Sequence, residues 1–167
     1  DGVIMWDGGA LARLRRGRAV LAPHIGLDTV LDGLPSAVRQ ALAAVVRDAI
    51  PGRPASPDPE SALAAFEGFR ILCAHRSGPF GQETVNRLIE ELLLAEGRLT
   101  RQGLWYPGRP ILVTANDYQL RLYNGDLGVA LPDPETDGAL RVTFRAPRGV
   151  FRRVAPARLP AHETAYA

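Results

Sequence analysis

The chain has 167 residues, of which 46% are hydrophobic and 23% are charged, and its formal net charge at pH 7 is +2. This balance excludes disordered and fibrous proteins, and the length suits one domain, or one domain that carries a small inserted module. The apolar runs fall short of the roughly 20 residues needed to cross a bilayer. The single Cys73 excludes an internal disulfide, so the sequence favours a protein of the reducing cytoplasm.

The basic residues restrict the chemistry further, because all 20 are arginine. A P-loop needs a Lys to reach the β- and γ-phosphates of ATP, so a Walker A site is excluded from this chain. Residues 1–97 carry 10 arginines against 12 acidic residues, whereas residues 98–167 carry 10 arginines, six acidic residues and all four tyrosines. Basic charge mixed with aromatic side chains permits nucleic-acid contact, although an ordinary solvated surface explains this modest charge equally well.

The first third of the chain predicts a strand, two helices and a loop. The apolar run Val3–Trp6 predicts a buried strand, and residues 10–20 predict a helix with a basic face. Ser36 is a suitable N-cap for a helix over residues 37–50, where apolar residues recur at helical spacing. The proline-rich stretch 51–59 predicts an exposed loop.

A short helix and a strand are expected next. Asp58 can cap a helix that runs from Pro59, a residue favoured at the first helical position, to about Glu67. The continuous apolar run Phe69–Ala74 has the length of a strand that is buried on both faces.

The turn-rich loop His75–Gly81 separates this strand from a second, amphipathic helix. That helix is predicted to start near Gln82, and Gly97 can close its end. Its apolar stripe consists of Val85, Leu88, Ile89, Leu92 and Leu93. The order strand, loop, helix indicates an α/β unit, in which functional loops lie at the carboxyl ends of the strands.

Beyond Gly97 the pattern changes to alternation with turn signals. Five short strands are expected, at Ile111–Thr114, Gln119–Tyr123, Leu127–Leu131, Leu140–Arg145 and Val150–Val154. Asn124-Gly125 predicts a hairpin with a type I′ turn, because both residues tolerate a positive φ. So many short strands close together predict a small β-barrel over residues 105–160.

Few residues suggest metal or hydrolytic chemistry. The three histidines have spacings that match no metal motif. Ser77 lies near a histidine, but the G-x-S-x-G pattern of a hydrolase is missing. Asp133, Glu135 and Asp137 alternate between prolines, which favours a solvated hairpin tip over a cation-binding loop. No metal site is therefore expected.

Three segments resemble a known helicase family. FRILCAHRSGPFGQETVNRLIE, residues 69–90, closely resembles motif IV of the RecD family of superfamily 1 DNA helicases, the alpha subunits of exodeoxyribonuclease V. In this motif a strand of the second RecA-like domain ends in Arg-x-Gly-Pro-(Phe/Trp)-Gly before a helix that contains Asn. WYPGRPILVTANDYQLRLYNGDLGVAL, residues 105–131, is similar to the segment where these helicases insert an SH3-like barrel. RLPAHETAYA, residues 158–167, resembles the return towards motif V.

The resemblance implies an α/β fold in three parts. Residues 1–104 would be a partial second RecA-like domain, residues 105–160 the SH3-like β-barrel insertion, and residues 161–167 the return to the RecA-like domain. The Walker motifs and motif V of the family are missing. Together with a start at Asp1 rather than Met, this leads us to expect a fragment of a longer protein.

The resemblance also implies roles for particular residues. Arg76 would reach the γ-phosphate of ATP as an arginine finger, and a surface salt bridge is the alternative for it. Asp117 and Asp126 also match the barrel's signature, although turn chemistry alone explains Asn124-Gly125-Asp126. The DNA-binding candidates are His75, Pro79, Asn116, Tyr118 and Asn124.

The parent function implied by the resemblance is ATP-driven, Mg²⁺-dependent 5′-to-3′ movement along single-stranded DNA. It would operate with RecB and RecC in double-strand break repair, and nuclease chemistry would reside in RecB. Two alternatives stay open: a stand-alone RecD-like helicase without these partners, and a non-enzymatic module that binds single-stranded DNA or a protein strand.

Overall fold

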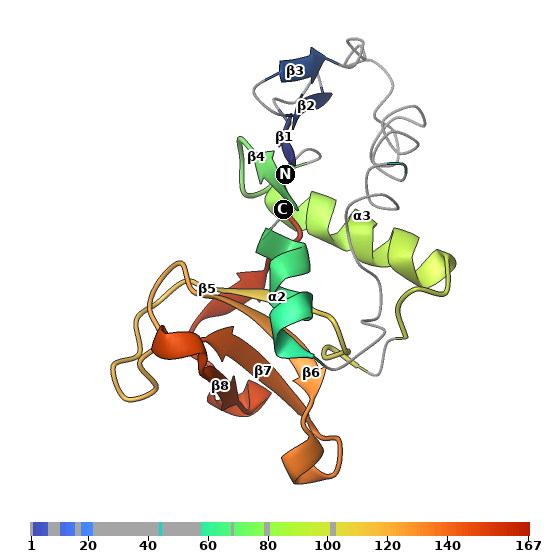
Figure 1. The fold of residues 1–167 in the computed structure, drawn as a ribbon. Helices are drawn as coiled ribbons and strands as arrows, with labels where there is room; N and C mark the ends of the chain where they lie inside the picture. Colours follow the sequence, from blue (N-terminus) through green and yellow to red (C-terminus); the bar gives the residue numbers. More distant parts are fainter. Residues whose placement is uncertain are drawn as a thin grey trace.

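A computed structural model describes residues 2–6, 11–15, 18–21, 44, 58–67, 69–78, 81–100 and 103–167 (Figure 1). Ala44 is helical, but the rest of the helix expected over residues 37–50 lies outside the described residues, as does the proline-rich stretch up to residue 57. The described residues form two sheets with helices beside them, which confirms a mixed α/β architecture.

The first sheet has the strand order β3-β2-β1-β4. Its strands are β1 (Gly2–Trp6), β2 (Leu11–Arg15), β3 (Arg18–Leu21) and β4 (Phe69–Cys73). β1 runs parallel to β4, with Gly2 opposite Phe69, and antiparallel to β2. The strands expected at Val3–Trp6 and Phe69–Ala74 are therefore confirmed.

The helix expected over residues 10–20 is wrong, because this segment contributes β2 and β3. The two strands pair antiparallel from Ala12 opposite Leu21 to Arg15 opposite Arg18, so only Arg16 and Gly17 separate them. Pairing of β2 with β1 supplies backbone hydrogen bonds that a helix would otherwise have to form by itself. The periodicity of apolar residues over so short a segment does not distinguish a helix from a strand.

The two helices expected after residue 58 agree with the structure. α2 spans Pro59–Glu67, and the backbone N–H of Ser61 donates to Oδ2 of Asp58 at 3.0 Å. α3 spans Gln82–Ala95.

The end of α3 is closed by Gly97, as expected. This glycine has φ +67°, its N–H donates to the Leu94 carbonyl at 3.0 Å, and the Arg98 N–H donates to the Leu93 carbonyl at 2.9 Å. This pair of bonds is the Schellman motif, which favours glycine because of its left-handed backbone.

Burial of β4 on both faces is not confirmed. Ile71 is buried, but the neighbouring Leu72 on the opposite face of the strand is 49% exposed. The reason is that α2 and α3 share a core with Ile71, whereas Leu72 has no place in either core cluster of the described residues.

The second sheet has the order β8-β7-β6-β5-β9, and all its neighbours pair antiparallel. The strands are β5 (Pro110–Val113), β6 (Leu127–Pro132), β7 (Leu140–Arg145), β8 (Phe151–Val154) and β9 (His162–Thr164), and the 3₁₀ turns are η2 (Pro134–Thr136), η3 (Pro147–Gly149) and η4 (Pro156–Arg158). Four of the five expected strands are thus confirmed. Within the described residues this sheet is open, so closure into an SH3-like barrel stays a prediction.

The strand expected at Gln119–Tyr123 is wrong, because this segment turns. Asp117 and Leu122 exchange backbone hydrogen bonds at 2.7 and 2.9 Å, and the residues between them form the turn. The side chain of Asp117 accepts a further bond from the Leu120 N–H at 2.9 Å. Such a local side-chain acceptor competes with strand pairing.

The type I′ turn is also wrong. Gly125 has φ +98°, but Asn124 does not adopt a positive φ. The turn is closed by the Asp126 N–H, which donates to the Tyr123 carbonyl at 2.9 Å. Gly125 and Asp126 bond back to Val113, so the turn ends a long excursion over residues 114–124 rather than a two-residue hairpin.

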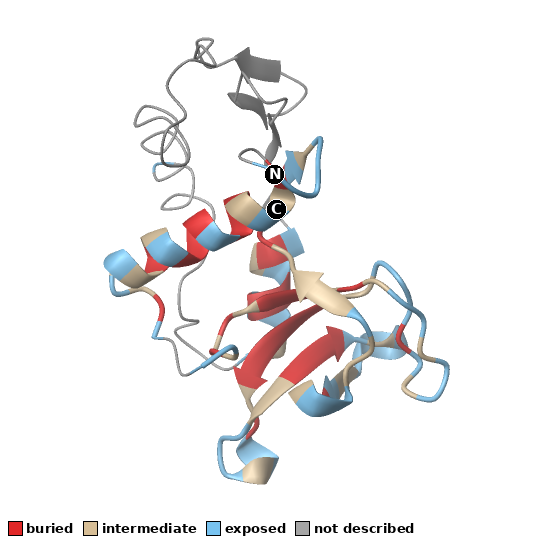
Figure 2. Cartoon of the chain, turned by 180° about the vertical axis from the view of Figure 1, so that it is seen from behind, coloured by how far each residue is buried: buried red, intermediate tan, exposed pale blue. Residues whose placement is uncertain are grey.

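Two apolar clusters cover the two faces of the second sheet. The first joins α2, β4 and α3 to Val129, Leu131 and Tyr166, and the second lies on the side of Ala130 and Phe144. Figure 2 shows this burial along the central strands and along one side of α3. The side chains of β6 therefore meet apolar neighbours on both faces, which explains its unbroken apolar sequence.

Candidate functional site

The loop between β4 and α3 carries Arg76 and is anchored to the start of the helix. The Gln82 N–H donates to the His75 carbonyl at 2.9 Å, and the Glu83 N–H donates to the Arg76 carbonyl at 3.0 Å. A Cβ atom on Gly81 would lie 2.5 Å from the Ser77 carbonyl carbon, so only glycine fits there. This packing presents Arg76 at the carboxyl end of β4.

Arg76 forms an ion pair with a residue from the other sheet. Its Nη2 donates to Oε2 of Glu163, in β9, at 2.6 Å, and the Arg76 side chain is 73% exposed. The second oxygen of Glu163 accepts from Nε2 of Gln82 at 3.2 Å. The C-terminal residues consequently run beside β4 and the start of α3 (Figure 1).

Asn86, on α3, holds the same C-terminal residues. Its Nδ2 donates to the Thr164 carbonyl at 2.9 Å, and its Oδ1 accepts from the N–H groups of Tyr166 at 3.0 Å and Ala167 at 2.9 Å. Asn86 is only 8% exposed. This amide therefore satisfies three backbone groups that would otherwise be buried without partners.

Arg109 completes a polar seam between α3 and β9. It donates through Nη2 to Oγ1 of Thr164 at 2.8 Å and through Nη1 to the Leu104 carbonyl at 2.6 Å, and its guanidinium carbon lies 4.8 Å from the centre of the Trp105 ring. We define the polar seam as Arg76, Gln82, Asn86, Arg109 and Glu163. A cavity of about 250 Å³ lies along it.

Beneath the polar seam lies a buried acid and phenol cluster. The Tyr106 hydroxyl donates to Oε1 of Glu90 at 2.6 Å and lies 3.4 Å from the Tyr166 hydroxyl. Burial raises the pKa of Tyr106 and of Tyr166, because the phenolate would lose its hydration. These hydroxyls therefore stay protonated and serve as structural groups.

The polar seam is not evident as a unit from the sequence. The motif points to Arg76 and to a helix that contains Asn86, but it does not indicate that Gln82, Arg109 and Glu163 lie beside them. One signal was available: Asn86 and Glu90 stand among the apolar residues of α3, and both are buried. A polar residue beside an apolar stripe predicts a buried hydrogen-bond partner, although it does not tell which segment provides it.

The tip loop, residues 114–124, brings together three of the DNA-binding candidates. Oδ1 of Asn116 accepts from the Asn124 N–H at 2.8 Å, so both residues shape the loop. Tyr118 is 75% exposed and its ring centre lies 6.2 Å from that of Tyr123, which is 47% exposed. The loop thus presents a pair of aromatic side chains.

The remaining DNA-binding candidates are not part of the tip loop. His75 is exposed on the loop after β4. Pro79 lies outside the described residues.

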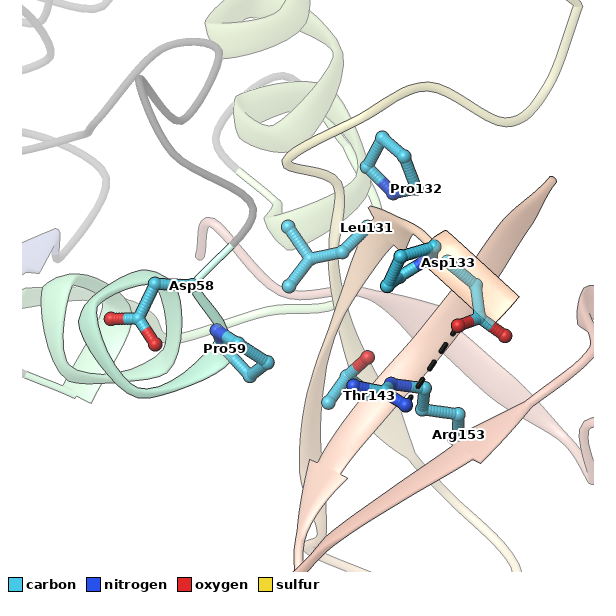
Figure 3. Close-up of a pocket in the computed structure, with 8 residues that line it drawn as sticks. Asp58, Pro59, Leu131, Pro132, Asp133, Thr143 and Arg153 are labelled. Atoms are coloured by element: carbon cyan, nitrogen blue, oxygen red, sulfur yellow. Dashed lines mark ion pairs between the residues drawn. The ribbon is translucent and has the colours of Figure 1, made fainter. Parts of the chain in front are cut away.

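A second cavity, of about 320 Å³, lies between the start of α2 and the turn after β6 (Figure 3). Asp133 is 4% exposed here and pairs with Arg141 at 2.9 Å and Arg153 at 3.8 Å. The expected hairpin tip is present. The prediction that Asp133 is solvated is wrong, because its carboxylate is enclosed by arginines and by its own turn. Among the described residues, no group of His, Cys, Asp and Glu is arranged to hold a metal ion.

In the part of the chain that the structure describes, we find no helix with the length and apolar character of a membrane span.

Comparisons with known proteins give the family context. No family model matches the chain. The RecBCD enzyme subunit RecD of Mycolicibacterium smegmatis is 51% identical over 78 residues, which cover 47% of this chain and 14% of the relative. The same subunit of Mycobacterium tuberculosis is 52% identical over 44% of this chain and 13% of the relative. That of Haemophilus influenzae is 36% identical over 64% of this chain and 15% of the relative.

The matched part of the chain thus spans only about one seventh of the length of these relatives. Identity above 50% over more than 70 residues nevertheless confirms the resemblance drawn from the motifs. The chain is therefore similar to a segment of the RecD subunits of the RecBCD enzyme.

Proposed function

We propose that this chain is part of an ATP-dependent 5′-to-3′ DNA helicase subunit, the alpha chain of a cytoplasmic exodeoxyribonuclease V that acts in double-strand break repair and recombination. Residues 1–104 would belong to its second RecA-like domain, residues 105–160 to an SH3-like barrel and residues 161–167 to the return. The observation that carries this proposal is the 51% identity to a RecD subunit. RecB, RecC and single-stranded DNA would be its partners.

Arg76 is the proposed catalytic residue. It lies at the carboxyl end of β4, its side chain is 73% exposed, and one of its nitrogens contacts Glu163. A guanidinium has five N–H donors and keeps its charge near neutral pH, so the other nitrogens suit the oxygens of a γ-phosphate. ATP and Mg²⁺ would supply the transferred phosphoryl group and its charge neutralisation. Because the chain has no Lys, the phosphate-cradling loop would lie elsewhere in the parent protein.

The tip loop is the proposed contact with single-stranded DNA. Exposed aromatic rings stack on bases of any sequence. Tyr118 and Tyr123 have the required exposure, and Asn116 and Asn124 hold the loop that presents them. His75 and Pro79 are further proposed contacts with single-stranded DNA, on the side of the RecA-like domain.

The two alternatives are less well supported. A stand-alone helicase and a non-enzymatic module both fit a small sheet with an exposed aromatic loop, but the relatives reported above are subunits of RecBCD. Copurification of the full-length protein with RecB and RecC would separate the first proposal from the stand-alone helicase. DNA-stimulated ATP hydrolysis by the same preparation would separate it from the non-enzymatic module.

The catalytic proposal is tested by Arg76→Ala in the full-length subunit with saturating single-stranded DNA. By analogy with arginine fingers, kcat should fall on the order of 10³-fold while nucleotide affinity changes much less. Arg76→Lys should also be impaired, because it keeps the charge but loses the planar fork. Arg145→Ala is the matched control, since Arg145 also pairs with a glutamate at 2.6 Å. A kcat within a few-fold of wild type in Arg76→Ala would show that Arg76 is a surface residue.

The DNA proposal is tested by Tyr118→Ala. Loss of one stacked base is worth about 1–3 kcal/mol, so single-stranded DNA binding should weaken by on the order of 10-fold. Tyr118→Phe should bind normally, because the ring is kept. Val150→Ala, at an exposed apolar residue outside the tip loop, is the control. If Tyr118→Ala binds single-stranded DNA with unchanged affinity, the tip loop does not contact the DNA.

A further inference from the structure

We propose that Glu163 is a positioning residue that orients the Arg76 guanidinium for catalysis. The proposal rests on the catalytic role proposed for Arg76. It adds a residue from the second sheet to a site that the sequence motif placed wholly after β4.

Contacts on both sides of Glu163 carry the inference. One carboxylate oxygen accepts from Nη2 of Arg76 at 2.6 Å, and the other accepts from Nε2 of Gln82 at 3.2 Å. The same Gln82 nitrogen donates to the Ala167 carbonyl at 3.0 Å. The Glu163 side chain is only 25% exposed. The carboxylate is therefore held in place from the helix side and offers a fixed acceptor to Arg76.

Arg76 by contrast depends on this contact. Its side chain is 73% exposed, and among the described residues its guanidinium has one acceptor, the Glu163 carboxylate, which it reaches through Nη2. A charge-assisted bond at one nitrogen limits the rotamers of a long side chain and leaves the N–H donors of Nη1 and Nε available to another acceptor. Without Glu163 the guanidinium would sample many orientations, few of which reach a phosphate. Correct orientation of a catalytic group contributes a large part of the rate acceleration by an enzyme.

The place of Glu163 is set by the second sheet. In the pairing of β9 with β5, Glu163 lies opposite Leu112. Arg76 belongs to the loop of the first sheet, so the ion pair joins the two sheets. The position of the second sheet thereby determines the orientation of the Arg76 guanidinium.

The test is ATPase kinetics of the full-length subunit with Glu163→Ala and with the isosteric Glu163→Gln. In Glu163→Ala we expect kcat to fall by roughly 10-fold to 100-fold, the loss associated with a misplaced catalytic group, while directly measured nucleotide affinity stays unchanged. Glu163→Gln should lose less, because its amide oxygen still accepts from Arg76. Glu60→Gln should have no effect, although Glu60 pairs with Arg145 at the same 2.6 Å.

A double variant separates this proposal from the one on which it rests. In an Arg76→Ala background, Glu163→Ala should produce no further loss of kcat, because residues that act through one another are not additive. If Arg76→Ala lowers kcat as expected but both Glu163 variants retain wild-type kcat, the positioning role is wrong and the catalytic role of Arg76 stands. A further loss of kcat in the double variant would also overturn the positioning role of Glu163. Wild-type kcat in Arg76→Ala would overturn it too, because Arg76 would then have no catalytic role. Should Glu163→Ala unfold, Glu163→Gln decides.

Discussion

The side chain of Asn86 accepts a hydrogen bond from the backbone N–H of Tyr166, 80 residues further along the chain, at 3.0 Å. Through this amide, α3 fixes the C-terminal residues between the two sheets. The Tyr166 carbonyl in turn accepts from the Ile71 N–H at 3.5 Å, so the same segment runs along β4. The position of the residues at the end of β9 and after it therefore depends on one buried polar side chain.

Asn86→Ala should lower the free energy of unfolding. The change leaves the Tyr166 and Ala167 N–H groups and the Thr164 carbonyl without their partner, and a buried unsatisfied group costs about 1–3 kcal/mol. Chemical denaturation measures the difference. Glu91→Ala, at an exposed position of the same helix, should change stability by less than about 0.5 kcal/mol. Equal effects of the two variants would contradict the role of Asn86.

Gly128→Ala should destabilise the second sheet. A Cβ atom there would lie 2.5 Å from Cε1 of Phe144 and 2.8 Å from Cγ1 of Val142. The Phe144 ring packs directly over the glycine of the neighbouring strand, so overpacking should cost about 1–3 kcal/mol. Thermal or urea unfolding checks this. The double variant Gly128→Ala/Phe144→Leu should be less destabilised than the sum of the single variants, and simple additivity would argue against the contact.

Stability should fall in alkaline solution because of Tyr106 and Tyr166. Burial raises the pKa of both phenols above the ordinary value of 10.0, so the unfolded chain loses these protons first. The contribution of the protonated phenols is fully present below pH 10 and is lost as the pH rises, by about 1.4 kcal/mol per pH unit for each group. Denaturation at several pH values, with tyrosinate absorbance as a second probe, measures the slope. Tyr106→Phe should reduce it, and an unchanged slope would exclude Tyr106 as its source.

Cys73 should react slowly with alkylating reagents. Burial raises the pKa of its thiol from 9.0 to about 11, which leaves little thiolate at neutral pH. The fraction of thiolate falls about 100-fold, but a more basic thiolate is a better nucleophile, so the net rate should be on the order of 10-fold lower. Iodoacetamide labelling of the native chain, compared with the chain in denaturant at the same pH, measures this ratio. Equal rates would mean that Cys73 is accessible and fully hydrated.

Local signals in the sequence determined several elements by themselves. Asp58 caps α2 and Gly97 ends α3, because each acts on backbone groups within a few residues of itself. The strand Leu140–Arg145 was predicted with the bounds that the structure shows, because its alternation and flanking turns mark it without reference to a partner. A contiguous motif likewise singles out Arg76, whose catalytic role stays a prediction.

The tertiary structure decided what depends on a distant partner. Leu11–Arg15 forms a strand rather than a helix because β1 is there to pair with it, and Gln119–Tyr123 turns because Asp117 supplies the acceptor. The pairing of Arg76 with Glu163 joins residues 87 positions apart, and nothing near either residue indicates the other. Such contacts form only when two sheets and a helix have packed together. Their geometry is therefore a property of the assembled core and not of any single segment.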